Sequence, residues 1–362
     1  MRPRRVLLVE EGWHATMYLA RALEDAGFAV TVLTANGTSA RCRARTVEWI
    51  SGPHVATSEL VPHVDRLMPD FDRVLPLTER AMRQLWAAPH AWIDRVFPAV
   101  EPWQGALVLD KHAVVEHMAA RGLATPRHVD VAAAGELGLP VVIKGATGSG
   151  GRMVHVADTR AELAAALEKA RVAGGRWIAQ EYIAGPTFLF GGVFDRGRPL
   201  RIYAAEKLEL HPARTGGAIR VRSRRDPDLV AAGLAAMREL AWTGFASADF
   251  MRGADGRYLL LEINPRLWGS LAGALAAGVD LFAPFCELLA GEAPRADLAF
   301  ADGVECLIFP RYLNARAHRT LAGLRRAWAD LRGEQGRDWR DPRFVAHVLH
   351  RLYWMRRHAE RM

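Results

Sequence analysis

The chain has 362 residues, half of them apolar and 24% charged, which suffices for two or three packed domains. It contains no apolar run near the roughly 18 residues that cross a bilayer, and the apolar stretch at its start is too short for a signal peptide. The net charge is +8, and the three cysteines form no closely spaced pair, so we expect a cytoplasmic protein without a disulfide framework.

The first part of the chain predicts an open parallel sheet. Residues 4–33 read as strand–helix–strand, further strands are expected at 46–50 and 72–78, and helices at Ser58–Met68 and Glu79–Ala87. Because strands alternate with helices, the strands should run parallel and bind ligands beyond their carboxyl ends. This places six residues near a possible substrate pocket: Glu10, Glu11, Trp13, His14, Thr78 and Glu79. No GxGxxG motif follows the first strand, so a dinucleotide site is not indicated.

The rest of the chain mixes hairpins with helices. A Pro- and Trp-rich linker at 89–106 precedes helices at 110–122 and near 133–138, two strands around the glycines of 145–151, a helix at 159–172 and a strand at 176–183. A hairpin turning at Asp195–Gly197, a helix at 226–242 and alanine-rich helices to about residue 290 follow. Residues 246–251 and 258–264 should pair as a hairpin, because an Asp-Gly turn separates them.

The second strand of that last hairpin carries two polar residues in an apolar run. Glu262 and Asn264 lie two positions apart, so their side chains share one face, and the hairpin can bring Asp249 beside Glu262. Such groups are unfavourable when buried without partners. Oxygen ligands with two carboxylates suit Mg²⁺ or Mn²⁺. The alternative is a pair of hydrogen-bonded residues that ends a strand.

Four motifs occur in a fixed order along the chain. They are Asp110–Lys111 before a helix, "VVIKGATGSGG", "WIAQEYIAG" and "DFMRGADGRYLLLEIN". In this order they resemble the ATP-grasp ligases over about 106–292, and the preceding segment resembles the pre-ATP-grasp domain. The resemblance implies an α/β and α+β fold: an N-terminal open parallel sheet (1–105), a two-lobed ATP-grasp domain and a helical C-terminal extension (311–362). Residues 106–190 would form the small lobe with its hinge, and 191–310 the metal-binding lobe.

The resemblance also implies ATP and Mg²⁺ (or Mn²⁺) as cofactors. Lys111 and Lys144 would neutralise phosphate charge, and the hinge would hold adenine, with a side-chain contact from Gln180 or Glu181. The full set of expected nucleotide contacts is Lys111, Lys144, Gly148, Ser149, Gly150, Gly151, Gln180, Glu181 and Ile183, and the expected metal ligands are Asp249, Glu262 and Asn264. Thr187 stands where family members often carry a ribose-binding acid, which leaves the ribose contact open.

Three basic residues other than Lys111 and Lys144 are candidates for catalysis. Arg266 follows the metal pair directly and is the first choice for stabilising a developing oxyanion. Arg222 lies in an arginine-rich segment that could bind an acid in bidentate fashion, and Lys207 could face the γ-phosphate. The alternatives for these two are an arginine-rich surface segment and a solvated lysine beside Glu206.

The expected activity is that of an ATP-dependent carboxylate–amine ligase, which activates a carboxylic acid as an acyl phosphate and transfers it to an amine. An Asp as the first metal ligand resembles the D-alanine–D-alanine ligase branch. The alternatives are an ATP-grasp phosphotransferase or carboxylase, and a nucleotide-binding or membrane-docking protein without turnover. The residues do not identify the acid or the amine.

The basic residues gather in the C-terminal extension. Residues 311–362 hold 13 arginines and 5 acidic residues, which accounts for the whole net charge. An amphipathic stripe in this segment could contact an anionic membrane or an acidic carrier, or it could pack on its own domain with a solvated basic face. No nucleic-acid motif occurs, so we expect no nucleic acid; the expected partners are a small-molecule acid and amine and a second copy in a homodimer.

Overall fold

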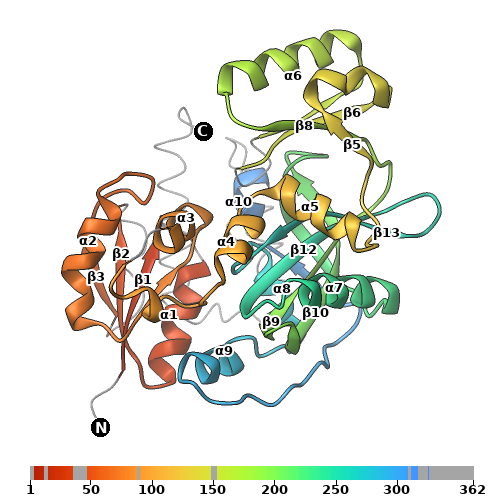
Figure 1. Ribbon diagram of the computed structural model, residues 1–362. Coiled ribbons are helices and arrows are strands. Elements are labelled where there is room, and N and C mark those ends of the chain that lie inside the picture. Colours follow the sequence, from red (N-terminus) through yellow and green to blue (C-terminus); the bar gives the residue numbers. More distant parts are fainter. Residues whose placement is uncertain are drawn as a thin grey trace.

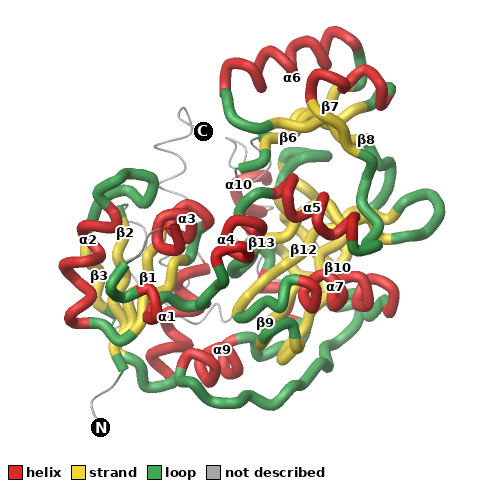
Figure 2. The backbone as a smooth tube through the Cα atoms, viewed as in Figure 1, coloured by secondary structure: helices red, strands yellow, loops and turns green. Residues whose placement is uncertain are grey.

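A computed structural model describes residues 4–11, 15–35, 47–87, 90–147, 153–308, 311–316 and 325. The described chain builds three sheets, each with its own helices, and the mixed α/β fold class is confirmed (Figures 1 and 2). Among the described residues, no helix combines the length and apolar character needed to cross a bilayer. The glycine-loop residues 148–151 and nearly all of the basic extension lie outside the described residues.

The N-terminal sheet is parallel, as its strand–helix alternation predicts. Its strands are β1 (Arg5–Glu10), β2 (Ala29–Thr34), β3 (Glu48–Ser51) and β4 (Arg73–Pro76), in the order β3-β2-β1-β4. The helices are α1 (Ala15–Asp25), α2 (Leu60–Leu67) and α3 (Glu79–Ala87), and the 3₁₀ helix η1 (Met68–Asp70) follows α2. Because β4 ends at Pro76 and α3 begins at Glu79, Glu79 lies just beyond the carboxyl end of β4.

The second sheet has four strands and belongs to the small lobe. Its strands are β5 (His128–Asp130), β6 (Val141–Gly145), β7 (Val154–Ala157) and β8 (Trp177–Glu181), all pairing antiparallel in the order β5-β8-β6-β7. Helix α6 (Arg160–Ala173) covers it, beginning at a capping box between Thr159 and Glu162 (Figure 1). The helix expected near 133–138 is a 3₁₀ helix, η3 (Val131–Leu137).

The third sheet has six strands and carries the expected hairpins. Its strands are β9 (Thr187–Asp195), β10 (Arg198–His211), β11 (Gly217–Ser223), β12 (Gly244–Arg252), β13 (Tyr258–Asn264) and β14 (Glu305–Leu307), in the order β13-β12-β9-β10-β11-β14. The turn at Asp195–Gly197 and the β12–β13 pairing are confirmed. Helices α7 (Pro227–Glu239), α8 (Leu271–Ala276), α9 (Phe282–Leu289) and α10 (Arg311–Arg316) belong to this lobe.

The segment read as a linker contains regular structure. It holds η2 (Ile93–Arg95) and the first part of α4 (Pro102–Val108), and α5 (Lys111–Ala120) follows. One apolar core joins the N-terminal sheet to the six-stranded sheet, with α1 lying against α9. Burial of this shared core fixes the N-terminal domain against the larger lobe, so that residues from both can meet at one site.

Candidate functional site

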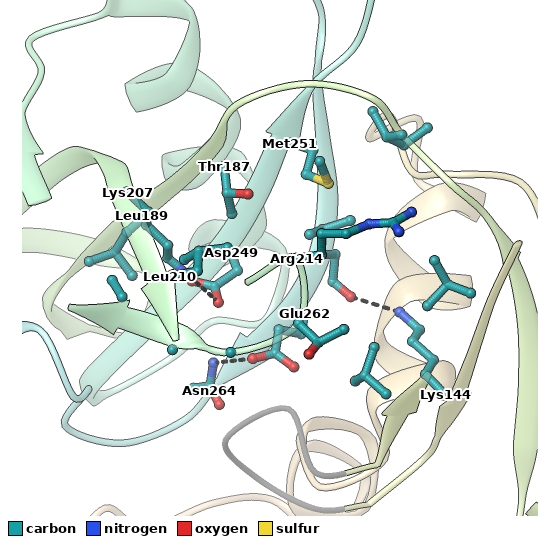
Figure 3. A pocket seen from close by; sticks show the side chains of 18 of the residues that line it. Lys144, Thr187, Leu189, Lys207, Leu210, Arg214, Asp249, Met251, Glu262 and Asn264 are labelled. Atoms are coloured by element: carbon teal, nitrogen blue, oxygen red, sulfur yellow. Dashed lines mark hydrogen bonds and ion pairs between the residues drawn. The ribbon is translucent and has the colours of Figure 1, made fainter. Parts of the chain in front are cut away.

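A cavity of about 470 Å³ lies where the small sheet faces the six-stranded sheet (Figure 3). Its walls come from β6, β7 and β8 on one side and from β9, β10, β12 and β13 on the other. This volume is typical of a small-molecule site. Of the residues expected to contact the nucleotide, those that line this cavity are Lys111, Lys144, Gln180, Glu181 and Ile183.

The predicted acidic pair lies on neighbouring strands that line this cavity. Asp249 on β12 is directly opposite Glu262 on β13, and Ser247 is opposite Asn264. Asn264 Nδ2 donates to Glu262 Oε1 at 3.0 Å, so the amide and the carboxylate point together, as Figure 3 shows. The placement expected from the hairpin is therefore confirmed, and three oxygen-bearing side chains line one wall.

Two lysines lie against the two carboxylates. Lys111 Nζ is 2.6 Å from Glu262 Oε2, and Lys207 Nζ is 2.6 Å from Asp249 Oδ2. Lys111 reaches this position because Asp110 caps the start of α5, accepting from the backbone N–H groups of His112 and Ala113. Lys207 thus faces the cavity, and its neighbour Glu206 pairs instead with Arg224.

Burial and these cations set the protonation of the acids. Burial alone would raise the pKa of Glu262, but the charge and hydrogen bond of Lys111, the hydrogen bond from Asn264 and the charge of Lys207 together outweigh burial and lower that pKa to about 2. Burial raises the pKa of Asp249 above its ordinary value. The Lys207 ammonium opposes this increase, and the negative charge of Glu262 adds to it. The two carboxylates thus differ in how readily they bind a proton, and Glu262 is the more firmly ionised.

Lys144 differs from the other two lysines in having no carboxylate in direct contact among the described residues. Its ammonium donates to the backbone oxygen of Leu261 at 3.1 Å (Figure 3). Burial lowers the pKa of Lys144 to about 8, since the attraction of Glu262 only partly offsets burial and the nearby Lys111 opposes it. The buried Lys144 ammonium therefore has no carboxylate in direct contact to neutralise its charge among the described residues.

The hinge, residues 180–183, forms another part of the cavity wall. Gln180 and Glu181 end β8 and, with Ile183, line the cavity near Leu189 and Met251. The Glu181 carboxylate accepts from the backbone N–H of Arg127 at 2.7 Å, so that side chain already has a partner. This favours Gln180 for a polar side-chain contact from this part of the wall. Thr187, at the start of β9, also lines the cavity.

Arg266 also lines the cavity and connects the two domains. Its Nη2 donates to Glu79 Oε1 at 3.0 Å and to Asn264 Oδ1 at 3.2 Å. Glu79 begins α3 of the N-terminal domain. Both side chains are largely buried, so this ion pair is held in a low-dielectric setting. The residues expected near a substrate pocket are absent from the described lining of this cavity (Glu10, Glu11, Thr78 and Glu79) or lie outside the described residues (Trp13 and His14).

Arg222 has a different environment from the one expected. It is on β11 and pairs with Glu305 of β14, which also pairs with Arg220. Arg222 is absent from the described lining of the cavity, so the structure does not bring it to the acidic pair. The arginine-rich segment mainly joins neighbouring strands of the sheet.

Two arginines that the motifs do not reveal line the cavity. Arg214 follows β10, pairs with Asp158 of the small lobe, and lies with its guanidinium carbon 4.5 Å from the centre of the Tyr182 ring. Arg311 begins α10. Neither could be found from motif spacing, since tertiary packing alone brings them here.

The described lining fits a polyphosphate held with a divalent cation. It contains six cationic side chains against three carboxylates, and the excess positive charge favours a polyanion. Ser247 Oγ is buried here without a hydrogen-bond partner. No cluster of three or more acidic, His or Cys side chains occurs among the described residues. The oxygen ligands that this lining offers a cation are those of Asp249, Glu262 and Asn264, and phosphate and water would complete its shell.

Comparisons with known proteins match this architecture. The family model of the ATP-grasp domain matches residues 108–270. The D-alanine–D-alanine ligase of Ectopseudomonas mendocina is 30% identical over 175 residues, covering 44% of this chain and 56% of that protein. The chain thus spans a little over half the length of the curated relatives it matches.

Two solved structures share the fold. The L-amino acid ligase of Bacillus licheniformis has a TM-score of 0.64 and 19% identity over 80% of this chain and 75% of that one. The biotin carboxylase domain of the 2-oxoglutarate carboxylase of Hydrogenobacter thermophilus has a TM-score of 0.68 and 16% identity over 83% and 73%. Residues 108–270 thus match the ATP-grasp domain, and the two solved structures share the fold of the chain around it.

Proposed function

We propose that the chain is an ATP-dependent carboxylate–amine ligase that uses Mg²⁺ or Mn²⁺. The observation that supports this proposal is that Asp249, Glu262 and Asn264 line the same cavity as Lys111 and Lys144. The relatives named as D-alanine–D-alanine ligases and as an L-amino acid ligase support the same reaction class.

In this proposal the lysines hold the triphosphate. On nucleotide binding, Lys111 and Lys207 would leave the carboxylates that they contact and turn to phosphate oxygens, while Lys144 is already buried beside the cavity. A divalent cation, when bound at the three oxygen ligands, would neutralise the charge of the transferred phosphoryl group. Gln180 and Ile183 would contact adenine, and the glycine loop 148–151 would contact the phosphates.

The proposed chemistry has two balanced steps. A carboxylate oxygen of the acid attacks the γ-phosphorus, the bond from that phosphorus to the bridging oxygen breaks, and ADP leaves with the electron pair. The amine nitrogen then attacks the acyl carbon, the bond to the phosphate oxygen breaks, and the ammonium proton passes to solvent or a base. Arg266, fixed by Glu79, would stabilise the oxyanion in both steps.

Release of ADP across a matrix of acids and amines tests this function. Amino acids are the first panel because both kinds of ligase relative act on them by name. Hydroxylamine in place of the amine should trap a hydroxamate from the activated acid. ADP release that needs neither an acid nor an amine would contradict the ligase proposal.

Carboxylation is the second candidate, favoured by the likeness to a biotin carboxylase domain. ADP release that depends on bicarbonate and yields no hydroxamate would support it. The solved relative is named as a dimer, so we also propose a homodimer, which light scattering would check. A cytoplasmic location remains our proposal for this chain.

The affinity for MgATP should fall as the pH rises through about 8. Burial lowers the pKa of Lys144 in the nucleotide-free protein, and the triphosphate needs the ammonium form, so binding above this pH takes up a proton. The Kd should be level below that pH and rise by at most about tenfold per unit above it. Calorimetry in buffers of different ionisation enthalpy measures the proton uptake. In Lys144→Arg, which keeps its charge, the profile should be flat; a flat wild-type profile would contradict the assignment.

Arg214→Ala should weaken MgATP binding modestly. Arg214 joins the small lobe to the larger one through Asp158 and packs on Tyr182 of the hinge, so its loss leaves the adenine end of the cavity more open. The pair is exposed to solvent, and we expect the KM for ATP to rise about two- to fivefold with kcat nearly unchanged. Steady-state kinetics check this; a large loss of kcat would indicate a direct role in the reaction.

A further inference from the structure

A second cavity lies on the other face of the hairpin that carries the acidic pair. Its volume is about 680 Å³, and its walls are the segment after α5, one side of α7 and the outer end of the β12–β13 hairpin. Both helices contact β13 (Figure 1). Because successive side chains of a strand point to opposite faces, Asp249 and Met251 line the cavity around the acidic pair (the main cavity), while Phe250 and Arg252 line the second one. One strand of the hairpin thus separates the two cavities.

The floor of the second cavity is apolar. Helix α7 presents Ala232 and Ala235 to it, and their short side chains leave space that a larger residue would fill. The remaining apolar walls are Leu123, Ala124 and the buried Phe250. This floor favours a ligand with a small apolar body, since the ligand would leave water on binding.

Arg252 supplies a cation at the edge of this floor. Its guanidinium carbon lies 5.6 Å from the centre of the Tyr258 ring, and its Nε donates to the backbone oxygen of Gly256 at 3.1 Å. Arg252 forms no ion pair with any residue that the structure describes. The ring and the carbonyl therefore hold the guanidinium in place and leave it without a carboxylate.

The other charges of this lining are compensated locally. Arg257 pairs with Asp255, and Arg121 pairs with the last residue of α7. Asp228 lies in the first turn of α7, where the helix dipole favours a carboxylate. The charge that remains for a ligand is that of Arg252, which favours an anion, and a planar guanidinium suits a carboxylate.

The backbone of Arg252 connects the second cavity to the hinge. Its N–H donates to the backbone oxygen of Pro186 at 3.1 Å. At Gly185 a Cβ would clash with the backbone oxygen of Arg252, so glycine is needed for this close approach. Gly185 and Pro186 line the main cavity just after the hinge. A ligand that holds the Arg252 side chain would therefore order the strand end against which the hinge segment packs.

We infer that the second cavity is an effector site for a small organic acid. The carboxylate of the acid accepts hydrogen bonds from Arg252, its apolar body fills the floor beside Ala232, and its binding tightens the nucleotide site. Tightening follows because a hinge that is already ordered loses less conformational freedom when nucleotide binds. By linkage, nucleotide tightens the acid by the same factor. This site goes beyond the proposed ligase activity and does not depend on it.

Hexanoate is the probe for this site, followed by ligand-observed NMR, with hexylammonium and acetate for comparison. Hexylammonium lacks the negative charge and acetate lacks the apolar body, so each should bind about fivefold or more weakly than hexanoate. Saturating hexanoate should lower the Kd of MgADP, measured by calorimetry, about fivefold.

Four variants locate the binding. Arg252→Gln should weaken hexanoate about tenfold, because a charge-assisted hydrogen bond is lost, and Ala232→Leu should abolish binding here by filling the floor. Ala231→Leu puts the same side chain on the exposed side of α7, and Arg171→Gln removes an exposed guanidinium of α6. Neither of these two controls should change hexanoate binding or its effect on MgADP.

Each result decides for or against the inference. Equal hexanoate binding by wild type, Arg252→Gln and Ala232→Leu would place the ligand elsewhere, such as in the main cavity, and would overturn it. Binding here with an unchanged Kd of MgADP would overturn the effector role, and tighter binding of hexylammonium would overturn the carboxylate assignment. If Arg252→Gln does not fold, Ala232→Leu decides by the same criteria. Failure of the proposed function would appear separately, as no ADP release with any acid and amine.

Discussion

Replacing Glu262 with glutamine should lower ADP release about a thousandfold. Glu262 is the more firmly ionised of the two carboxylates, and it contacts Lys111 directly and Asn264 through a hydrogen bond. Glutamine keeps the volume but removes the charge that would hold a divalent cation against the triphosphate. Coupled-enzyme detection of ADP, with an acid and amine found by the screen, measures the loss.

The control for this prediction is Glu206→Gln. Glu206 lies on β10 next to Lys207, pairs with Arg224 and is absent from the described cavity lining, so its loss should leave ADP release within about twofold. Because removing Glu262 also removes the attraction to Lys111, circular dichroism at the assay temperature must show that the variant is folded. A folded Glu262→Gln protein with normal turnover would refute the metal assignment.

Lys144→Met should change stability and nucleotide binding in opposite directions. In the nucleotide-free protein the buried ammonium has no carboxylate in direct contact, so an apolar side chain of similar length should raise the free energy of unfolding by about 1–2 kcal/mol. The same change removes a cation from the triphosphate and should weaken MgATP about a hundredfold. Thermal melting and calorimetric titration of MgATP measure the two effects.

Lys169→Met is the matched control for this substitution. Lys169 is an exposed lysine of α6 in the same lobe and lies outside the lining of the main cavity, so neither property should change appreciably. If Lys144→Met lowered stability and left MgATP binding intact, Lys144 would be a structural residue. That result would remove it from the proposed phosphate contacts.

The parts of the site that sequence predicts are those set by local structure. Asp249 meets Glu262 because the Asp-Gly turn fixes the register of one hairpin, and the alternation of a strand places Asn264 on the face of Glu262. Lys111 follows from a capped helix start, and Lys144 from a strand that ends at the glycine loop. These relations span few residues and need no knowledge of distant packing.

The parts that sequence did not predict depend on contacts between distant segments. Glu79 and Arg266 are 187 residues apart in sequence and meet because the N-terminal domain shares a core with the larger lobe. Arg222 and Arg311 are both arginines of basic segments, and their types alone do not show that one pairs with Glu305 while the other enters the cavity. The hydrogen bond that Glu181 accepts from the backbone N–H of Arg127 likewise joins distant segments, and it favours Gln180 for the proposed adenine contact.

A crystal structure with Mg²⁺ and a non-hydrolysable ATP analogue tests the central claim most directly. The account predicts a cation bound by oxygens of Asp249, Glu262 and Asn264, with Lys144 on a phosphate oxygen and Lys111 moved away from its present contact with Glu262. A nucleotide bound elsewhere, or one in this cavity with the Lys111–Glu262 and Lys207–Asp249 pairs intact and no cation between them, would contradict it.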